Sequence, residues 1–172
     1  MRPKDLTYLG AFRLPGGDEP PLTFAYGGNA MTYNPDNTTL FITGHDRQAY
    51  GTLPNGGQVA EVSIPTPVIA ANPADLPQAT FVQNFYNVFN GQFVGLDEIP
   101  RVGLQYLNHP VTGALLHVAW GTHMQGEPIL GEGQQRRFRL LDAAYAPTRG
   151  LLFVLEPFSD GVKPVVHVWQ VR

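Results

Sequence analysis

The chain has 172 residues, 15% of them charged, and a formal net charge of −3, so it can bury the core of one domain. It carries no basic stripe and no apolar run of membrane-spanning length, which argues against nucleic acid as a partner and against a membrane span. It contains no Cys, which excludes a disulfide framework, a thiolate metal site and a cysteine nucleophile.

In chain order, the first predicted element is a strand over 6–14, followed by a Gly- and Pro-rich loop. The segment 29–44 reads as a hairpin, because two apolar runs flank a turn of the type Asn-Pro-Asp-Asn. A strand over 58–64 is expected to complete a four-stranded unit with the hairpin and the opening strand. The Pro- and Ala-rich segment 65–77 should run extended over the surface.

Further along, 80–89 fits either a helix or a strand, and the surrounding β composition favours a strand. The hairpin pattern of 29–44 then returns twice, loosely over 104–121 and without a gap over 141–156. In the third copy, the positions of Tyr33, Pro35, Leu40 and Phe41 are taken by Tyr145, Pro147, Leu152 and Phe153. The last predicted strand covers 165–171.

The repeated hairpins predict an all-β fold. The second strand of each copy is apolar at consecutive positions, which is typical of a strand buried on both faces. Blades of a β-propeller have this property, so we expect a propeller-like array of antiparallel hairpins with about two and a half blades. A β-sandwich is the alternative. The single domain 1–172 would contain units at 6–65, 78–121 and 137–172 and an irregular connector at 122–136.

The same reading leaves about two strands missing between 121 and 138, and a closed propeller usually needs at least about four blades. The unpaired blade edges that result would favour association with further copies of the chain, so a homo-oligomer is the expected partner. The compartment stays open; an extracellular or periplasmic location is favoured, although these residues include no secretory signal.

Several segments resemble the two ends of long bacterial β-propeller-like proteins of uncharacterised function. The segments that carry the resemblance to the start of these proteins are 6–15, 24–31 and 41–46, and 165–172 resembles their last strand. The resemblance extends over 5–124 and 137–172. It implies that the chain holds both ends of a longer propeller-like molecule without its middle, and it supplies no catalytic residue.

Polar residues follow the second strand of each hairpin, where loops of stacked blades open on one rim. His45, Asp46 and His123 would suit a divalent cation, which is the one cofactor that the sequence suggests. Asp46, Glu127 and Glu156 would suit the paired carboxylates of glycoside hydrolysis. The alternative for all of them is that each side chain caps its own turn or pairs with a nearby backbone amide.

A second set of residues combines carboxylates with aromatic rings, which suits recognition of a carbohydrate ligand. The set consists of Asp18, Glu19, Tyr26, Tyr50 and Trp120. Packing in the core or between blades is the alternative for the aromatic members.

Three function classes follow. The first is a non-catalytic binding or self-assembling module of propeller type, with a glycan as its candidate ligand. The second is a carbohydrate-active enzyme, either a glycoside hydrolase or a lyase, that uses the acidic rim residues. The third is a metal-dependent site at the His/Asp rim. The first is favoured, and whether the protein is an enzyme stays open.

Overall fold

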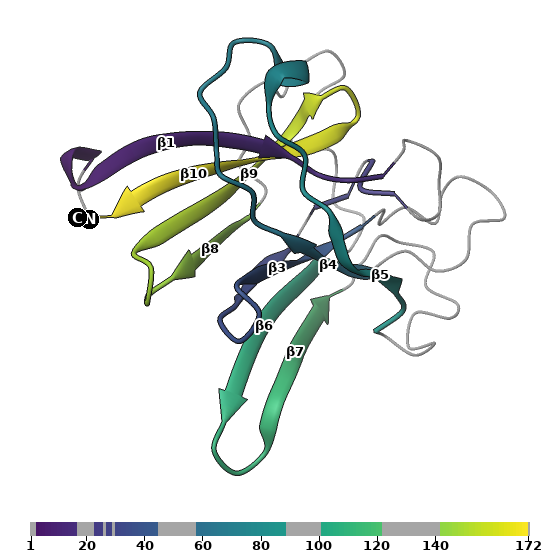
Figure 1. Cartoon of the computed structure of the whole chain (residues 1–172). Helices are drawn as coiled ribbons and strands as arrows, with labels where there is room; N and C mark the ends of the chain where they lie inside the picture. Colours follow the sequence, from purple (N-terminus) through teal and green to yellow (C-terminus); the bar gives the residue numbers. More distant parts are fainter. Residues whose placement is uncertain are drawn as a thin grey trace, which may run out of the picture.

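A computed structural model describes residues 3–16, 23–25, 27–28, 30–44, 58–88, 101–121 and 142–171. Within these ranges the chain forms strands and two short 3-10 turns, and no α-helix (Figure 1). The turns are η1 (Pro3–Asp5) and η2 (Pro73–Asp75), and the strands are β1 (Leu6–Arg13), β2 (Met31–Asn34), β3 (Thr39–Thr43), β4 (Val59–Ser63), β5 (Phe81–Tyr86), β6 (Arg101–His109), β7 (Gly113–Gly121), β8 (Ala143–Ala146), β9 (Leu151–Asp160) and β10 (Lys163–Val171). The predicted all-β class is confirmed. No helix in these ranges has the length and apolarity needed to cross a membrane.

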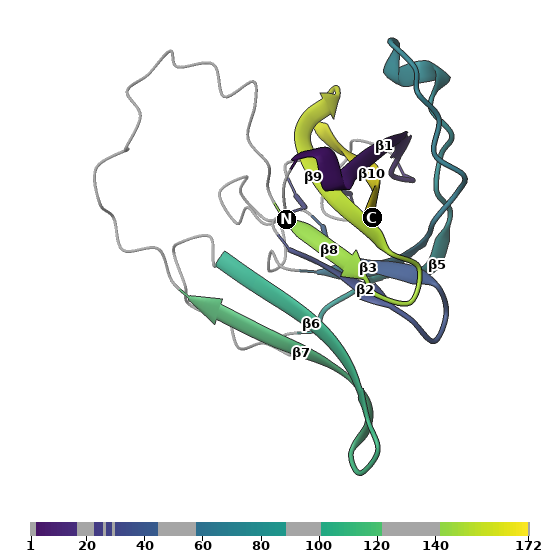
Figure 2. The same cartoon turned by 90° about the vertical axis from the view of Figure 1, so that its left-hand side faces the viewer.

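The strands form three antiparallel sheets. The terminal sheet has the order β1-β10-β9-β8, the middle sheet the order β2-β3-β4-β5, and the third sheet is the β6-β7 hairpin. Figure 2 shows the middle sheet between the hairpin on one side and the terminal sheet on the other. Across the described segments, these sheets close into neither a barrel nor a propeller ring.

Strands β2, β3 and β4 of the middle sheet are buried on both faces because each face packs on another sheet. In β3, Leu40 and Ile42 join the main core, which also contains Phe153 of the terminal sheet. Phe41, on the other face of β3, packs against a smaller core that includes Leu104 of the hairpin. The continuous apolar run of the first copy therefore predicts its burial correctly. The hairpin differs, because its outward residues have no covering sheet among the described segments.

The first and third copies of the sequence repeat have the same strand register. Tyr33 of β2 pairs with Leu40 of β3, and the equivalent Tyr145 of β8 pairs with Leu152 of β9. The same local pattern of turn residues and apolar positions thus produces the same hairpin twice.

Two aromatic stacks join the copies in a fixed direction. Phe153 of the terminal sheet stacks on Tyr33 of the middle sheet, with ring centroids 6.2 Å apart and planes inclined by 18°. Phe41 of the middle sheet, which is equivalent to Phe153, stacks on Tyr106 of the hairpin at 5.8 Å and 25°. The third and first copies therefore each present a Phe on the second strand to a Tyr on the first strand of the neighbouring copy.

The opening strand lies in a different sheet from the one expected. β1 pairs with the last strand, β10, in a register that runs from Leu6 opposite Val171 to Arg13 opposite Val165. The fourth strand of the middle sheet is instead β5, which pairs with β4, so the strand predicted over 80–89 is confirmed in type. Grouping 6–65 as one unit therefore does not match the sheet topology. Local sequence carries no signal for pairing between strands so far apart.

A β-bulge at Gly10 brings the connector 65–77 onto the terminal sheet. Gly10 has φ +125°, and a Cβ there would lie 2.4 Å from the carbonyl carbon of Val68. The next residue, Ala11, exchanges two backbone hydrogen bonds with Val68, at 3.0 and 3.1 Å. Leu76 then packs on Ala11 and Val165, so the connector covers part of the outer face of the terminal sheet.

Candidate functional site

The free edges of three strands meet around one cavity. β2, β6 and β8 each stand at the end of their sheet, and β2 contacts both of the others. A cavity of about 320 Å³ lies between them and is lined mainly by polar surface. The lining residues are Met31, Thr32, Tyr33, Gly103, Leu104, Gln105, Asp142, Ala143, Ala144 and Tyr145. A free strand edge exposes backbone N–H and C=O groups, which explains the polarity of the wall.

Asp142 connects two of these edges. Its Oδ2 accepts a hydrogen bond from the amide of Met31 at 2.6 Å, and its Oδ1 accepts one from the amide of Ala143 at 2.8 Å. Burial raises the pKa of the Asp142 carboxyl above its ordinary value, and the two backbone amides oppose that shift without cancelling it. The side chain thus replaces a strand partner for Met31 and places a half-buried carboxyl at the cavity wall.

Thr32 and Asp36 fix the hairpin against the middle sheet on the third side of the cavity. The hydroxyl of Thr32 accepts a hydrogen bond from the backbone amide of Tyr106 at 3.1 Å. The carboxylate of Asp36 accepts from the Tyr106 hydroxyl at 2.7 Å and from Nδ2 of Asn108 at 2.8 Å. The hydrogen bond to Asp36, with smaller contributions from burial and from negative charge, raises the pKa of Tyr106 to about 12.

A second polar group lies on the outer face of the terminal sheet. Nε2 of His167 lies 2.7 Å from Oε2 of Glu156, and Nδ1 of the same ring lies 2.9 Å from the Tyr8 hydroxyl. A carboxylate can only accept, so Nε2–H donates to Glu156, and in the neutral imidazole Nδ1 then accepts from Tyr8. Trp169 packs beside Tyr8 with ring centroids 5.2 Å apart. Burial, and secondarily the charge of Glu156, raises the pKa of Tyr8.

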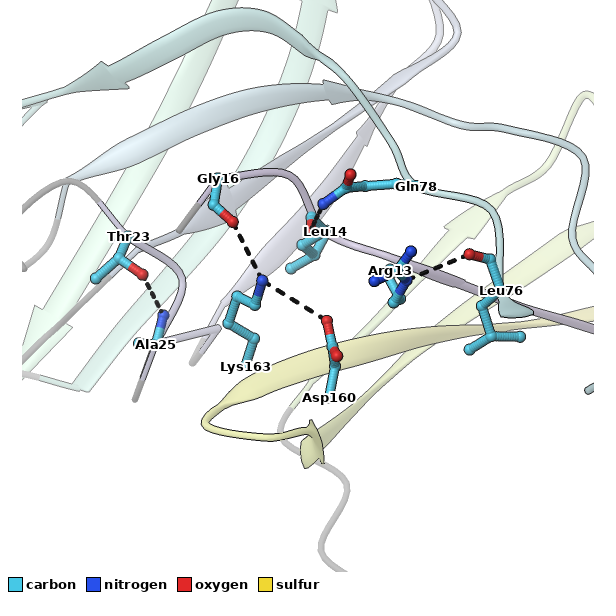
Figure 3. Close-up of polar contacts among 9 residues, drawn as sticks. All are labelled: Arg13, Leu14, Gly16, Thr23, Ala25, Leu76, Gln78, Asp160 and Lys163. Carbon is cyan, nitrogen blue, oxygen red and sulfur yellow. Dashed lines mark hydrogen bonds and ion pairs between the residues drawn. The ribbon is translucent and has the colours of Figure 1, made fainter. Parts of the chain in front are cut away.

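A third polar group lies where β1 leaves the terminal sheet (Figure 3). Nζ of Lys163 donates to the carbonyl of Gly16 at 3.1 Å and lies 3.7 Å from Oδ2 of Asp160. At the end of β1, Nε of Arg13 donates to the carbonyl of Leu76 at 3.2 Å. These contacts fix the end of the β9-β10 hairpin and the connector to β1, which gives them a structural role.

Most of the residues predicted as sites lie outside the described residues. These are Asp18, Glu19, Tyr26, His45, Asp46, Tyr50, His123 and Glu127. Trp120 belongs to β7, and nothing is described of its side chain. Glu156 is the one predicted site residue whose side chain is described, and it is paired with His167. Within the described ranges, no three His, Asp or Glu side chains are grouped so that they could hold a metal ion. The metal site at His45, Asp46 and His123 stays a prediction.

The sequence pattern did not single out Asp142, Tyr8, Tyr106 or His167 as site residues. A usable signal existed for His167, because strand alternation places it on one face with Val165 and Trp169. No comparable signal existed for Asp142, because its partner Met31 lies in a different hairpin.

The geometry defines an all-β protein of three stacked antiparallel sheets with a polar cavity at their free edges. No family model, no curated protein and no solved structure matches the chain.

Proposed function

We propose that the chain is a non-catalytic binding module of propeller type, in which the three sheets act as successive blades and the cavity between β2, β6 and β8 holds a glycan. The observation that carries this proposal is the convergence of three free strand edges on one polar cavity. In a propeller, the innermost strand of each blade lines a central channel. The resemblance of the chain ends to propeller-like proteins supports the same arrangement.

The chemistry of the cavity wall suits a neutral, hydroxyl-rich ligand. The half-buried carboxyl of Asp142 can accept hydrogen bonds, and the strand edges add backbone groups that accept and donate. The volume of about 320 Å³ lies at the lower end of the range for small-molecule sites, which is about 300–1,000 Å³. A monosaccharide or the end of a longer glycan matches both features.

The enzymatic alternative has weaker support. Glu156 would be one of its carboxylates, but this side chain is held by His167 on the outer face of the terminal sheet and does not line the cavity. Its predicted partners Asp46 and Glu127 lie outside the described ranges. Binding without catalysis is therefore the function that we propose.

A panel of neutral saccharides, screened by NMR chemical-shift perturbation, tests the proposal. We expect at least one sugar to shift the backbone amides of Met31, Gln105 and Ala143. Gly103 lines the cavity, and a Cβ there would meet no atom within 4 Å, so Gly103→Leu adds bulk at the wall without a clash. This variant should weaken binding at least about tenfold, a change of about 1.4 kcal/mol.

The matched control is Ala119→Leu. Ala119 is the cross-strand partner of Gly103 on the same hairpin but does not line the cavity. Binding that responds equally to both variants, or a panel in which no sugar shifts the cavity amides, would refute the proposal.

A further inference from the structure

We propose that the outer face of the terminal sheet and the outer face of the β6-β7 hairpin are the two halves of one interface, through which a second copy of this chain associates head to tail. The contact is sheet face on sheet face, and so differs from pairing between open strand edges.

The same kind of interface already occurs twice inside the chain. The terminal sheet meets the middle sheet through Phe153 on Tyr33, and the middle sheet meets the hairpin through Phe41 on Tyr106. Both contacts run in the same direction, from the second strand of one copy to the first strand of the next. A series of this kind ends in two different faces, one at each end.

The face at the start of the series carries Tyr145. Tyr145 is equivalent to Tyr33 in the repeat and occupies the same register, but Tyr33 is 6% exposed while Tyr145 is 47% exposed. Tyr33 lies on the face of the middle sheet that the terminal sheet covers. Tyr145 lies on the equivalent face of the terminal sheet. In the terminal sheet this face has no such cover among the described segments.

This face carries a continuous row of large side chains across all four strands of the terminal sheet. Cross-strand pairing aligns Tyr145 with Leu152, Leu152 with Trp169, and Trp169 with Tyr8. We call these four residues the outer row. The connector covers the neighbouring positions Ala11 and Val165 but leaves Tyr8 38% exposed. A row of aromatic and apolar residues is what a packed sheet-on-sheet contact requires.

The face at the other end of the series is the outer face of the β6-β7 hairpin. On the outer face of the hairpin, Leu107 pairs directly with Leu115, and these residues are 47% and 44% exposed. The adjacent pair on this face is Gln105 with His117. The inward face of the same hairpin packs on the middle sheet through Leu104 and Leu116.

The occupant follows from the direction of the series. In the two internal contacts, the second strand of one copy packs on the first strand of the next. By the same rule, the outer row needs the second strand of another hairpin as its partner. The outer face of the β6-β7 hairpin needs the first strand of another hairpin. Another copy of this chain offers both. Such heterologous contacts form a ring when the rotation closes and an open filament when it does not. Two copies would supply six sheets, which is within the range of about four to eight blades in closed propellers.

The experiment is sedimentation velocity over a concentration series up to about 1 mM, where even a Kd of 1 mM gives measurable dimer. Trp169→Glu places a charge in the outer row, and Leu115→Glu places one on the hairpin face. Each variant alone should associate at least tenfold more weakly than the unmodified chain. Val82→Glu is the control, because Val82 is 52% exposed on β5 and belongs to neither face.

A mixture of the two variants gives the decisive readout. Trp169→Glu keeps an intact hairpin face and Leu115→Glu keeps an intact outer row, so together they should form a one-to-one dimer that neither forms alone. This recovery also shows that both variants are folded. A plateau of the unmodified chain at the dimer indicates a closed ring, and a continued rise indicates an open filament; both support the interface.

Three outcomes would overturn the inference. The unmodified chain could stay monomeric at every concentration. Either variant alone could associate like the unmodified chain, which would indicate contact between like faces or pairing between strand edges. The mixture could fail to dimerise although each variant gives the circular dichroism spectrum of the unmodified chain. The variants lie outside the ligand cavity, so failure here leaves the saccharide-binding proposal to its own test.

Discussion

The carboxylate of Glu156 and the imidazole of His167 form a hydrogen-bonded pair with Oε2 and Nε2 2.7 Å apart, on neighbouring strands of the terminal sheet. This pair fixes the ring of His167 so that its second nitrogen meets the hydroxyl of Tyr8. A carboxylate that the sequence suggested for catalysis therefore orients a tyrosine on a sheet surface.

We expect Glu156→Gln to lower the pKa of Tyr8 toward its ordinary value without reaching it. Burial is the main cause of the raised pKa of Tyr8 and remains in the variant, whereas the charge of Glu156 is lost. Ultraviolet titration of the phenolate measures the change, and Tyr8→Phe identifies which step in the titration belongs to Tyr8. An unchanged titration would show that Glu156 exerts no field at this hydroxyl.

Alkaline pH should weaken the attachment of the hairpin to the middle sheet. The pKa of Tyr106 is raised from 10.0 to about 12 in the folded protein, mainly by its hydrogen bond to Asp36. The stability that this bond contributes is therefore complete below pH 10 and is lost as the pH rises toward 12. Urea unfolding at a series of pH values measures this loss. Asp36→Asn removes the ionised acceptor, so its stability should fall less steeply over the same range.

Removal of the Asp142 side chain should destabilise the junction of β2 and β8. Asp142→Ala deprives the amide of Met31 of its acceptor, and an unsatisfied buried amide costs about 1–3 kcal/mol. Denaturant unfolding gives the free energy, and hydrogen exchange at the Met31 amide should accelerate. Asp36→Ala is the comparison, because its carboxylate accepts from exposed side chains of the hairpin. An equal loss of stability in both variants would contradict the special role of Asp142.

Gly10→Ala should separate the connector from the terminal sheet. The new alanine would have to adopt a φ of +125° with its Cβ 2.4 Å from the backbone of Val68. Backbone strain and steric overlap should together lower the free energy of unfolding by about 2 kcal/mol or more. Gly113→Ala is the matched control, since Gly113 has φ +77° but open space around it. The difference in unfolding free energy between the two variants isolates the close approach of Val68. Equal unfolding free energies in the two variants would show that the connector can move away from residue 10 without a loss of stability.

Local features of the fold were predictable, because turn chemistry and apolar spacing act within a few residues. Tyr33 with Leu40 and Tyr145 with Leu152 have the register that their common pattern implies. The partner of β1 was not predictable, because nothing near Leu6 indicates a strand that ends at Val171. The same reason applies to the site: Asp142 and Met31 meet across the fold, and only packing brings them together.

The pairing of β1 with β10 has a consequence for how the protein acquires its shape. The first strand emerges from the ribosome long before its neighbour in the sheet, and Figure 1 shows β1 beside β10. Until β10 is synthesised, β1 lacks its neighbour in the sheet, and its unpaired edge can pair with a strand of another protein. The terminal sheet therefore cannot be completed before β10 has been synthesised. Folding should be slow, because the pairing of β1 with β10 joins residues that lie far apart in the sequence.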